Sequence, residues 1–190
     1  MDEKATEIST LGEFGLIDRL TRDFPLRNPS SLKGVGDDCA VMEYKDTDVL
    51  VSTDLLVEGI HFDLTYVPLK HLGYKAAVVN FSDIYAMNGH PRQITVSLAI
   101  SRRFTVEHME QLYAGIRLAC EIYGVDLVGG DTTSSRSGLV ISVTAIGDAP
   151  RDRIVYRSGA TDTDLIGVSG DLGAAYMGPE LLEREKVASA

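Results

Sequence analysis

Residues 94–101 read Ile-Thr-Val-Ser-Leu-Ala-Ile-Ser, and this stretch decides the fold class. Its apolar side chains alternate with small or polar ones, which is the pattern of a strand with one buried face. The flanking segments have helical apolar spacing instead, at about 69–87 and at 105–123, where Thr105 predicts an N-cap and Gly124 the end. A strand between two such helices predicts a sheet with helices packed on it.

Shorter apolar runs predict four more strands and one earlier helix. The strands are expected at 39–42, 49–52, 126–128 and 139–147, and the helix at about 12–23, before Pro25. The order is then helix, β, β, α, β, α, β, β. It predicts an α+β (mixed α/β) domain in which two main helices cover one sheet.

This domain is expected to occupy residues 1–149. Residues 150–190 would hold a linker and the beginning of a second domain, with a strand at 164–168 and a helix at 172–186. Because forty residues are too few to bury a core of their own, we expect the chain to be a fragment of a longer protein.

The composition narrows the class of protein. The 190 residues carry 18 Lys and Arg against 28 Asp and Glu, a formal charge of -10, so nucleic acid is not an expected partner. No apolar run is long enough to span a bilayer, and the acidic N-terminus does not look like a secretory signal. The two cysteines stand far apart and form no CxxC motif. We expect a soluble, cytoplasmic protein without a disulfide framework.

Aspartate beside glycine is the first feature that could carry chemistry. Residues 34–41 read Gly-Val-Gly-Asp-Asp-Cys-Ala-Val, which places two carboxylates where a turn enters a strand. Neighbouring strand residues point to opposite faces, so only one of Asp37 and Asp38 can face a given ligand. A solvated turn explains this motif equally well.

A second group follows the apolar strand that ends near Val51. Ser52, Thr53 and Asp54 are expected at its carboxyl end, where open sheets bind ligands, and their oxygens are hard donors suited to Mg²⁺. His61 follows seven residues later in a loop. It is either a ligand contact or an ordinary loop histidine.

Two further motifs place aspartate in apolar surroundings. Asn80 and Asp83 are three residues apart in the second helix, so both face one side of it, either as a solvated face or as cation ligands. Residues 127–133 read Leu-Val-Gly-Gly-Asp-Thr-Thr, a strand followed by glycines that permit close approach of a phosphate, and by Asp131, which can carry a cation to it. Together the four motifs predict several divalent cations that screen a polyphosphate.

The combination of motifs resembles the thiamine-monophosphate kinase family. The matching segments, in this order and with similar spacing, are GEFGLI at 12–17, GVGDDCAV at 34–41, STDLLVEGIHF at 52–62, NFSDIYAMNG at 80–89, LVGGDTT at 127–133 and RSGA at 157–160. The GDD and GGD elements are shared with aminoimidazole ribonucleotide synthetase, selenophosphate synthetase and the hydrogenase-maturation dehydratase. The STD element with its EGIHF loop, together with NFSD, favours the thiamine enzyme.

The resemblance implies a fold, a reaction and a set of site residues. It implies the N-terminal domain of the aminoimidazole ribonucleotide synthetase-like fold, dimerising through its sheet, and transfer of the ATP γ-phosphoryl group to thiamine monophosphate with several Mg²⁺ ions. Carried over motif by motif, the implied metal ligands are Asp38, Ser52, Thr53, Asp54, Asp83 and Asp131, the ATP contacts are Gly130, Asp131 and Arg157, and the substrate contact is His61. No residue is implied as a general base.

Members of that family continue well beyond the length of this chain, so activity of the 190-residue chain alone is an open question. Two alternatives also stay open. One is another ATP-using enzyme of the same superfamily, in hydrogenase maturation or purine synthesis. The other is a non-catalytic dimerisation domain that binds Mg²⁺ and nucleotide.

Overall fold

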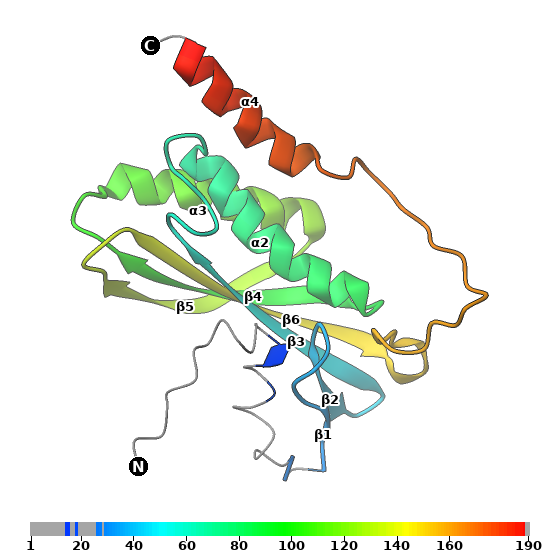
Figure 1. The fold of residues 1–190 in the computed structure, drawn as a ribbon. Coiled ribbons are helices and arrows are strands. Elements are labelled where there is room, and N and C mark those ends of the chain that lie inside the picture. The colour runs from blue at the N-terminus through cyan, green and yellow to red at the C-terminus, as the bar shows by residue number, and fades with distance from the viewer. Residues whose placement is uncertain (1–13, 16–17, 19–25, 28, 189–190) are drawn as a thin grey trace, which may run out of the picture.

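The computed structural model describes residues 14, 15, 18, 26, 27 and 29–188, and it contains one six-stranded sheet covered on one face by two helices (Figure 1). The strands are β1 (Ser31–Lys33), β2 (Ala40–Tyr44), β3 (Thr47–Val57), β4 (His90–Ile100), β5 (Asp126–Ser134) and β6 (Leu139–Pro150); the helices are α2 (Leu69–Ala86), α3 (Val106–Tyr123) and α4 (Ala174–Ala188), with a short 3-10 helix at Arg151–Arg153. The expected mixed α/β class, with two main helices over one sheet, is confirmed.

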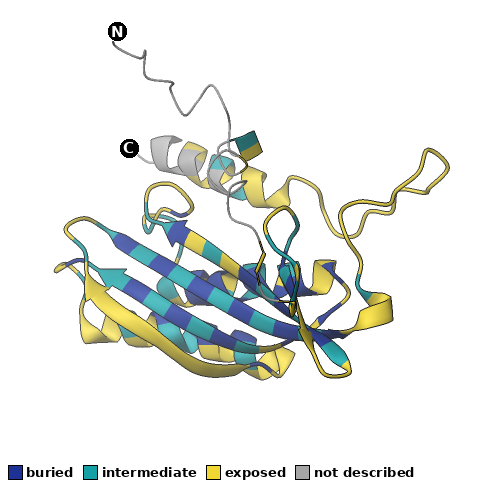
Figure 2. Cartoon of the chain, turned by 90° about the horizontal axis from the view of Figure 1, so that it is seen from below, coloured by how far each residue is buried: buried dark blue, intermediate teal, exposed yellow. Residues whose placement is uncertain are grey.

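The sheet order is β1-β2-β3-β6-β4-β5, and only the β4–β5 pair is parallel. β4 behaves as its alternating sequence predicts, because Ile94, Val96 and Leu98 are at most 4% exposed while Thr95 and Ser97 lie on the opposite face and are half-buried. The stripes of buried and partly buried residues are visible when the sheet is seen from the side opposite the helices (Figure 2). β5, the edge strand next to β4, is exposed along its whole length.

The second long helix begins and ends where the sequence predicts. The Thr105 hydroxyl oxygen accepts the N–H of His108, and Gly124 ends the helix in the left-handed conformation at φ 66°. Two glycines that the sequence analysis did not single out bring α2 and α3 into backbone contact. A Cβ atom at Gly73 would lie 1.9 Å from the Leu112 carbonyl oxygen, and one at Gly115 would lie 1.9 Å from that of Lys70.

The strands are longer than predicted, which corrects the placement of two motifs. β3 pairs with β6 without a break from Thr47 to Val57, so Ser52–Asp54 lies in the middle of the strand and not at its carboxyl end. β5 continues through Ser134, so Gly129–Asp131 is part of the strand and does not follow it. Polar residues interrupt the apolar pattern in both segments, but ladder hydrogen bonds to the neighbouring strand carry the chain through them.

The C-terminal part agrees with the sequence only in its helix. α4 confirms the helix expected at 172–186, but residues 164–168 form no strand. Leu165 and Ile166 are 99% and 95% exposed, and within the described part of the chain nothing pairs with them. The helix expected at 12–23 falls largely outside the described residues, and the short strand β1 was not expected. No helix in the described part is long and apolar enough to cross a membrane.

Candidate functional site

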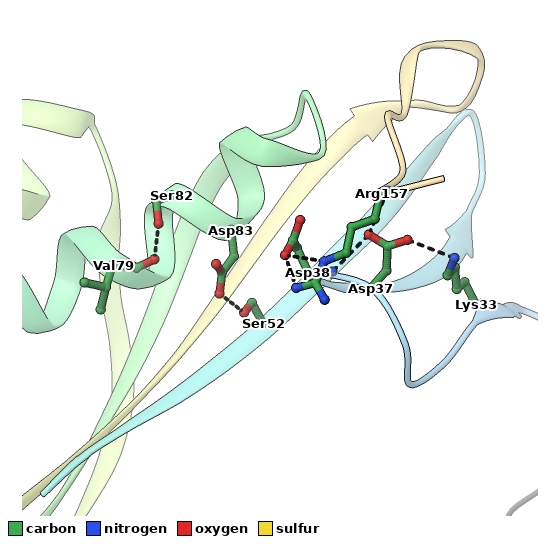
Figure 3. Close-up of polar contacts among 8 residues, drawn as sticks. All are labelled: Lys33, Asp37, Asp38, Ser52, Val79, Ser82, Asp83 and Arg157. Atoms are coloured by element: carbon green, nitrogen blue, oxygen red, sulfur yellow. Dashed lines mark hydrogen bonds and ion pairs between the residues drawn. The ribbon is translucent and has the colours of Figure 1, made fainter. Parts of the chain in front are cut away.

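Four of the predicted ligand residues come together between β3 and α2. Ser52 and Asp54 project from the helix-covered face of β3, Asp83 projects from α2, and Asp38 belongs to the loop before β2. The Ser52 hydroxyl donates to Oδ2 of Asp83 at 2.5 Å (Figure 3). We call Asp38, Ser52, Asp54 and Asp83 the acidic cluster.

Asn80 fixes the backbone of the cluster from inside the protein. It is fully buried; its Oδ1 accepts the N–H of Asp54 at 3.0 Å, and its Nδ2 donates to the carbonyl oxygen of Ala76 at 2.9 Å. β2 pairs with β3 only as far as Val51, so Asn80 supplies the acceptor that a neighbouring strand would otherwise provide. As predicted, Asn80 and Asp83 share one face of α2, and that face is turned toward β3.

Electrostatics make the cluster attractive to cations. Burial raises the pKa of Asp83 above its ordinary value, and the nearby carboxylates of Asp54 and Asp38 raise it further, against the opposing effect of the Ser52 hydrogen bond. The neighbouring Cys39 thiol has a pKa raised to about 12, by burial first and then by the charges of Asp83, Asp38 and Asp37. A bound cation would reduce the electrostatic repulsion between these carboxylates.

Two basic side chains approach the cluster from the loop side. Arg157 donates through Nε to Oδ1 of Asp38 at 2.9 Å and also reaches that carboxylate through Nη2, while Lys33 lies 2.9 Å from Oδ2 of Asp37 (Figure 3). Asp37 and Asp38 differ in their main side-chain partners, but the backbone N–H of Arg157 also donates to Oδ1 of Asp37 at 3.4 Å. Both residues lie in the bend before β2, so the alternation expected from a strand does not apply to them. Lys33, the last residue of β1, also lies over the Tyr156 ring, so these contacts anchor residues 156–157 to β1 and to the loop before β2.

The cluster suits a hard divalent cation by its donor chemistry. Among the residues that the structure describes, no three His, Cys, Asp or Glu side chains are already grouped around a metal position. The donors that do converge are carboxylate and hydroxyl oxygens, which are the preferred ligands of Mg²⁺.

Thr53 does not join the cluster through its side chain. Adjacent strand residues face opposite ways, and the Thr53 hydroxyl lies on the other face of the sheet, 3.0 Å from both the Val143 carbonyl oxygen and the Thr144 hydroxyl. The sequence motif Ser-Thr-Asp is therefore divided between the two faces.

Gly130 and Asp131 lie in a different place, on β5. Two strands, β6 and β4, separate β5 from β3, so strand spacing alone puts about 14 Å between Asp131 and the acidic cluster. A Cβ atom at Gly130 would lie 1.9 Å from the Val96 carbonyl oxygen, so the close β4–β5 approach requires glycine whatever ligand binds there. Asp131 is exposed.

A hollow of about 520 Å³ lies beside Gly130 and Asp131, with Tyr113 of α3 among its lining residues. A more apolar hollow of about 640 Å³ between α3 and β5 shares Tyr113 and Leu127 with it. Tyr113 could not be identified from the sequence, because nothing in the local pattern of α3 separates it from the other apolar positions.

His61 lies in the turn after β3 and lines a hollow of about 210 Å³ together with Asp54 and Lys75. The structure thus brings the expected substrate contact next to one residue of the acidic cluster. Lys75 was also missed by the sequence analysis. Its spacing of eight residues from Asp83, two helical turns, is the signal that places it on the same face of α2.

Known proteins resemble this chain in sequence and in structure. Residues 36–149 match the family model "AIR synthase related protein, N-terminal domain". The chain is 39% identical over 179 residues to a thiamine-monophosphate kinase of Aquifex aeolicus, a match that covers 94% of the chain and 55% of that protein. It is 37% identical over 176 residues to a thiamine-monophosphate kinase of Bacillus subtilis, a match that covers 92% of the chain and 54% of that protein. The solved structure of AaThiL complexed with AMPPCP and TMP superposes with a TM-score of 0.84 at 37% identity, covering 96% of this chain and 56% of that one. The chain spans about half the length of these relatives.

Proposed function

Since the chain belongs to the family of AIR synthase related proteins through the N-terminal domain of that family, we propose that it is part of a thiamine-phosphate kinase. The reaction is the ATP-dependent phosphorylation of thiamine monophosphate to thiamine diphosphate. The curated relatives that carry this name cover almost the whole chain, and AaThiL has been solved with AMPPCP, an analogue of ATP, and with TMP.

The observation that carries this proposal is the convergence of Asp38, Ser52, Asp54 and Asp83 in a chain whose charge of -10 would otherwise repel both phosphorylated substrates. In the proposed assignment these residues hold Mg²⁺, and Asp131 holds a separate ion, because about 14 Å of sheet is too far for one ion to bridge. The Thr53 side chain is left out of this set, since it faces the other side of the sheet.

The nucleotide would lie along β5, where Gly130 and Asp131 line the 520 Å³ hollow. Arg157, which holds Asp38 in this structure, would exchange that carboxylate for ATP phosphate oxygens. His61 would contact thiamine monophosphate beside Asp54.

In the reaction, an oxygen of the substrate phosphate bonds to the γ-phosphorus of ATP, and the bond from that phosphorus to the bridging oxygen breaks to release ADP. Mg²⁺, when bound, neutralises the charge that accumulates on the transferred group. The chain's carboxylates and Arg157 align the two phosphates in line. The attacking oxygen is already ionised at neutral pH, so no general base is required.

We propose further that the protein is a cytoplasmic homodimer that pairs through the sheet, with residues 1–149 as the nucleotide-binding and dimerisation domain and 150–190 as the linker and start of a second domain. Two features support pairing. No described helix covers the face of the sheet opposite α2 and α3 (Figure 2), and the edge strand β5 is exposed. Light scattering coupled to size exclusion would test the dimer, and a monomer at all concentrations would contradict it.

The test of the function is formation of thiamine diphosphate from thiamine monophosphate and ATP in the presence of Mg²⁺, for the 190-residue chain and for a longer chain that contains it. Thermal-shift binding of thiamine monophosphate against formylglycinamidine ribonucleotide separates the kinase from a purine-pathway enzyme. If nucleotide binding occurs in both chains without turnover in either, the non-catalytic alternative replaces the proposal.

A further inference from the structure

The turn that follows β3 holds the His61 side chain in one orientation. The backbone N–H of His61 donates to the Val57 carbonyl oxygen at 2.9 Å, and its ring Nδ1 lies 3.0 Å from the backbone nitrogen of Val57. The N–H of Gly59, at φ 80°, donates to the carbonyl oxygen of Phe62 at 2.8 Å and closes the same turn. Residues 57–62 therefore form a hydrogen-bonded turn that fixes the imidazole.

This geometry determines which ring nitrogen of His61 carries the proton. A backbone N–H can only donate, so Nδ1 accepts the bond from Val57 and carries no proton. The neutral ring must then carry its proton on Nε2, at the opposite side of the imidazole. His61 thus offers an N–H donor, and not an acceptor, to whatever binds beside it.

Lys75 adds a positive charge next to that donor. Its Nζ donates to the His61 carbonyl oxygen at 3.2 Å, and its side chain is exposed. With the residues that the structure describes, Lys75 makes no ion pair to a carboxylate. An ammonium group held by a single neutral carbonyl retains donors for an anion.

The hollow that His61 and Lys75 line, together with Asp54 and the apolar Leu55, Leu56 and Val79, is large enough for a small anion. Its volume of about 210 Å³ corresponds to roughly seven water molecules, enough for a phosphate group with some water. Whole drug-sized ligands occupy about 300–1,000 Å³. Asp54 of the acidic cluster lines the same hollow, so an anion bound there would lie beside the proposed cation.

We propose that Lys75 is a specificity-determining residue that binds the monophosphate of the substrate together with the Nε2–H of His61. The identity of the substrate rests on the proposed function. The chemistry itself, a cation and a fixed N–H donor beside a metal-binding carboxylate, would also bind inorganic phosphate.

The experiment is calorimetric titration of the 190-residue chain, in excess Mg²⁺, with thiamine monophosphate, thiamine and inorganic phosphate. Loss of a charge-assisted hydrogen bond predicts that Lys75→Gln weakens the binding of thiamine monophosphate and of inorganic phosphate about ten- to a hundred-fold and leaves thiamine unchanged. Lys75→Arg should retain most of the affinity. The matched control is Lys70→Gln, which removes the same charge from an exposed position of α2 and should change nothing.

The outcomes separate this inference from the proposed function. Equal binding of thiamine monophosphate by the wild type and by Lys75→Gln would overturn the inference and leave the kinase proposal intact. Binding of inorganic phosphate that depends on Lys75, without preference for thiamine monophosphate, would support the anion site and contradict the kinase proposal. No binding of either phosphate compound to the wild type would overturn the inference. Nitrogen NMR of His61 gives a further test, since a protonated Nδ1 in the neutral ring would contradict the donor geometry.

Discussion

Replacing Asn80 with alanine should destabilise the chain and disturb the acidic cluster together. The change removes two hydrogen bonds, a partly buried one from the Asp54 N–H and a buried one to the Ala76 carbonyl oxygen. The Asp54 N–H loses the Asn80 acceptor, at a cost of about 1–3 kcal/mol, and the second bond contributes about 1 kcal/mol. Alanine's higher helix propensity returns about 0.5 kcal/mol, so the net loss in the free energy of unfolding is about 1.5–3.5 kcal/mol.

For a chain of this length each kcal/mol lowers the unfolding midpoint by about 2–4 °C, so the expected fall is about 3–14 °C. Urea and thermal unfolding of Asn80→Ala measure it, and Mg²⁺ titration followed by the same midpoint reports on the cluster. Ser82→Ala is the matched control, because Ser82 is exposed and its hydroxyl donates to the Val79 carbonyl oxygen of its own helix (Figure 3). Its effect should stay within about 0.5 kcal/mol. A loss below about 1 kcal/mol for Asn80→Ala, or an unchanged response to Mg²⁺, would refute the reasoning.

Three further changes test other parts of the structure. Gly73→Ala should lower the free energy of unfolding in urea by at least about 1–3 kcal/mol, because its Cβ would overlap the Leu112 carbonyl oxygen. The control is Gly178→Ala in α4, whose Cβ would meet nothing within 4 Å, and equal effects of the two changes would contradict the close helix contact. Asp83→Asn should raise the unfolding midpoint in EDTA at neutral pH. Burial and neighbouring carboxylates raise the pKa of Asp83 above 3.8, so its contribution to stability is present at low pH and lost as the pH rises through that raised value. The neutral Asn side chain avoids the charge that destabilises the wild type at neutral pH. Mg²⁺ should stabilise the wild type more than this variant, and a midpoint that is lower in EDTA for the variant would contradict the assignment. Asp131→Asn should weaken Mg²⁺-dependent ATP binding without lowering the unfolding midpoint, since Asp131 is exposed; equal ATP affinity in EDTA and in Mg²⁺ for the wild type would contradict a metal role altogether.

Periodicity by itself determined the layers of the fold. The alternation in 94–101 and the helical spacing around it predicted a strand between two covering helices, because the side chain period is fixed by local backbone geometry. The caps of α3 at Thr105 and Gly124 were equally local and equally correct. The strand predicted at 164–168 is not formed. Its formation is not a local property, since an apolar run becomes a strand only where a partner strand is within reach.

Tertiary pairing decided what the local pattern could not. The lengths of β3 and β5 depend on hydrogen bonds to β6 and β4, and these longer strands moved Ser52–Asp54 and Gly130–Asp131 into strand interiors. The sequence could name Ser52, Thr53 and Asp54 as oxygen donors, but only the sheet shows that Thr53 faces away from the others.

The same distinction applies to the site. Residue types and motifs identified the aspartates and His61 from the sequence, because their chemistry is a property of each side chain. The partnership of His61 with Lys75, fourteen residues apart, and the support of Asp54 by Asn80, twenty-six residues apart, exist only because α2 packs against β3. Contacts between distant residues follow from packing, which no local pattern of side chains encodes.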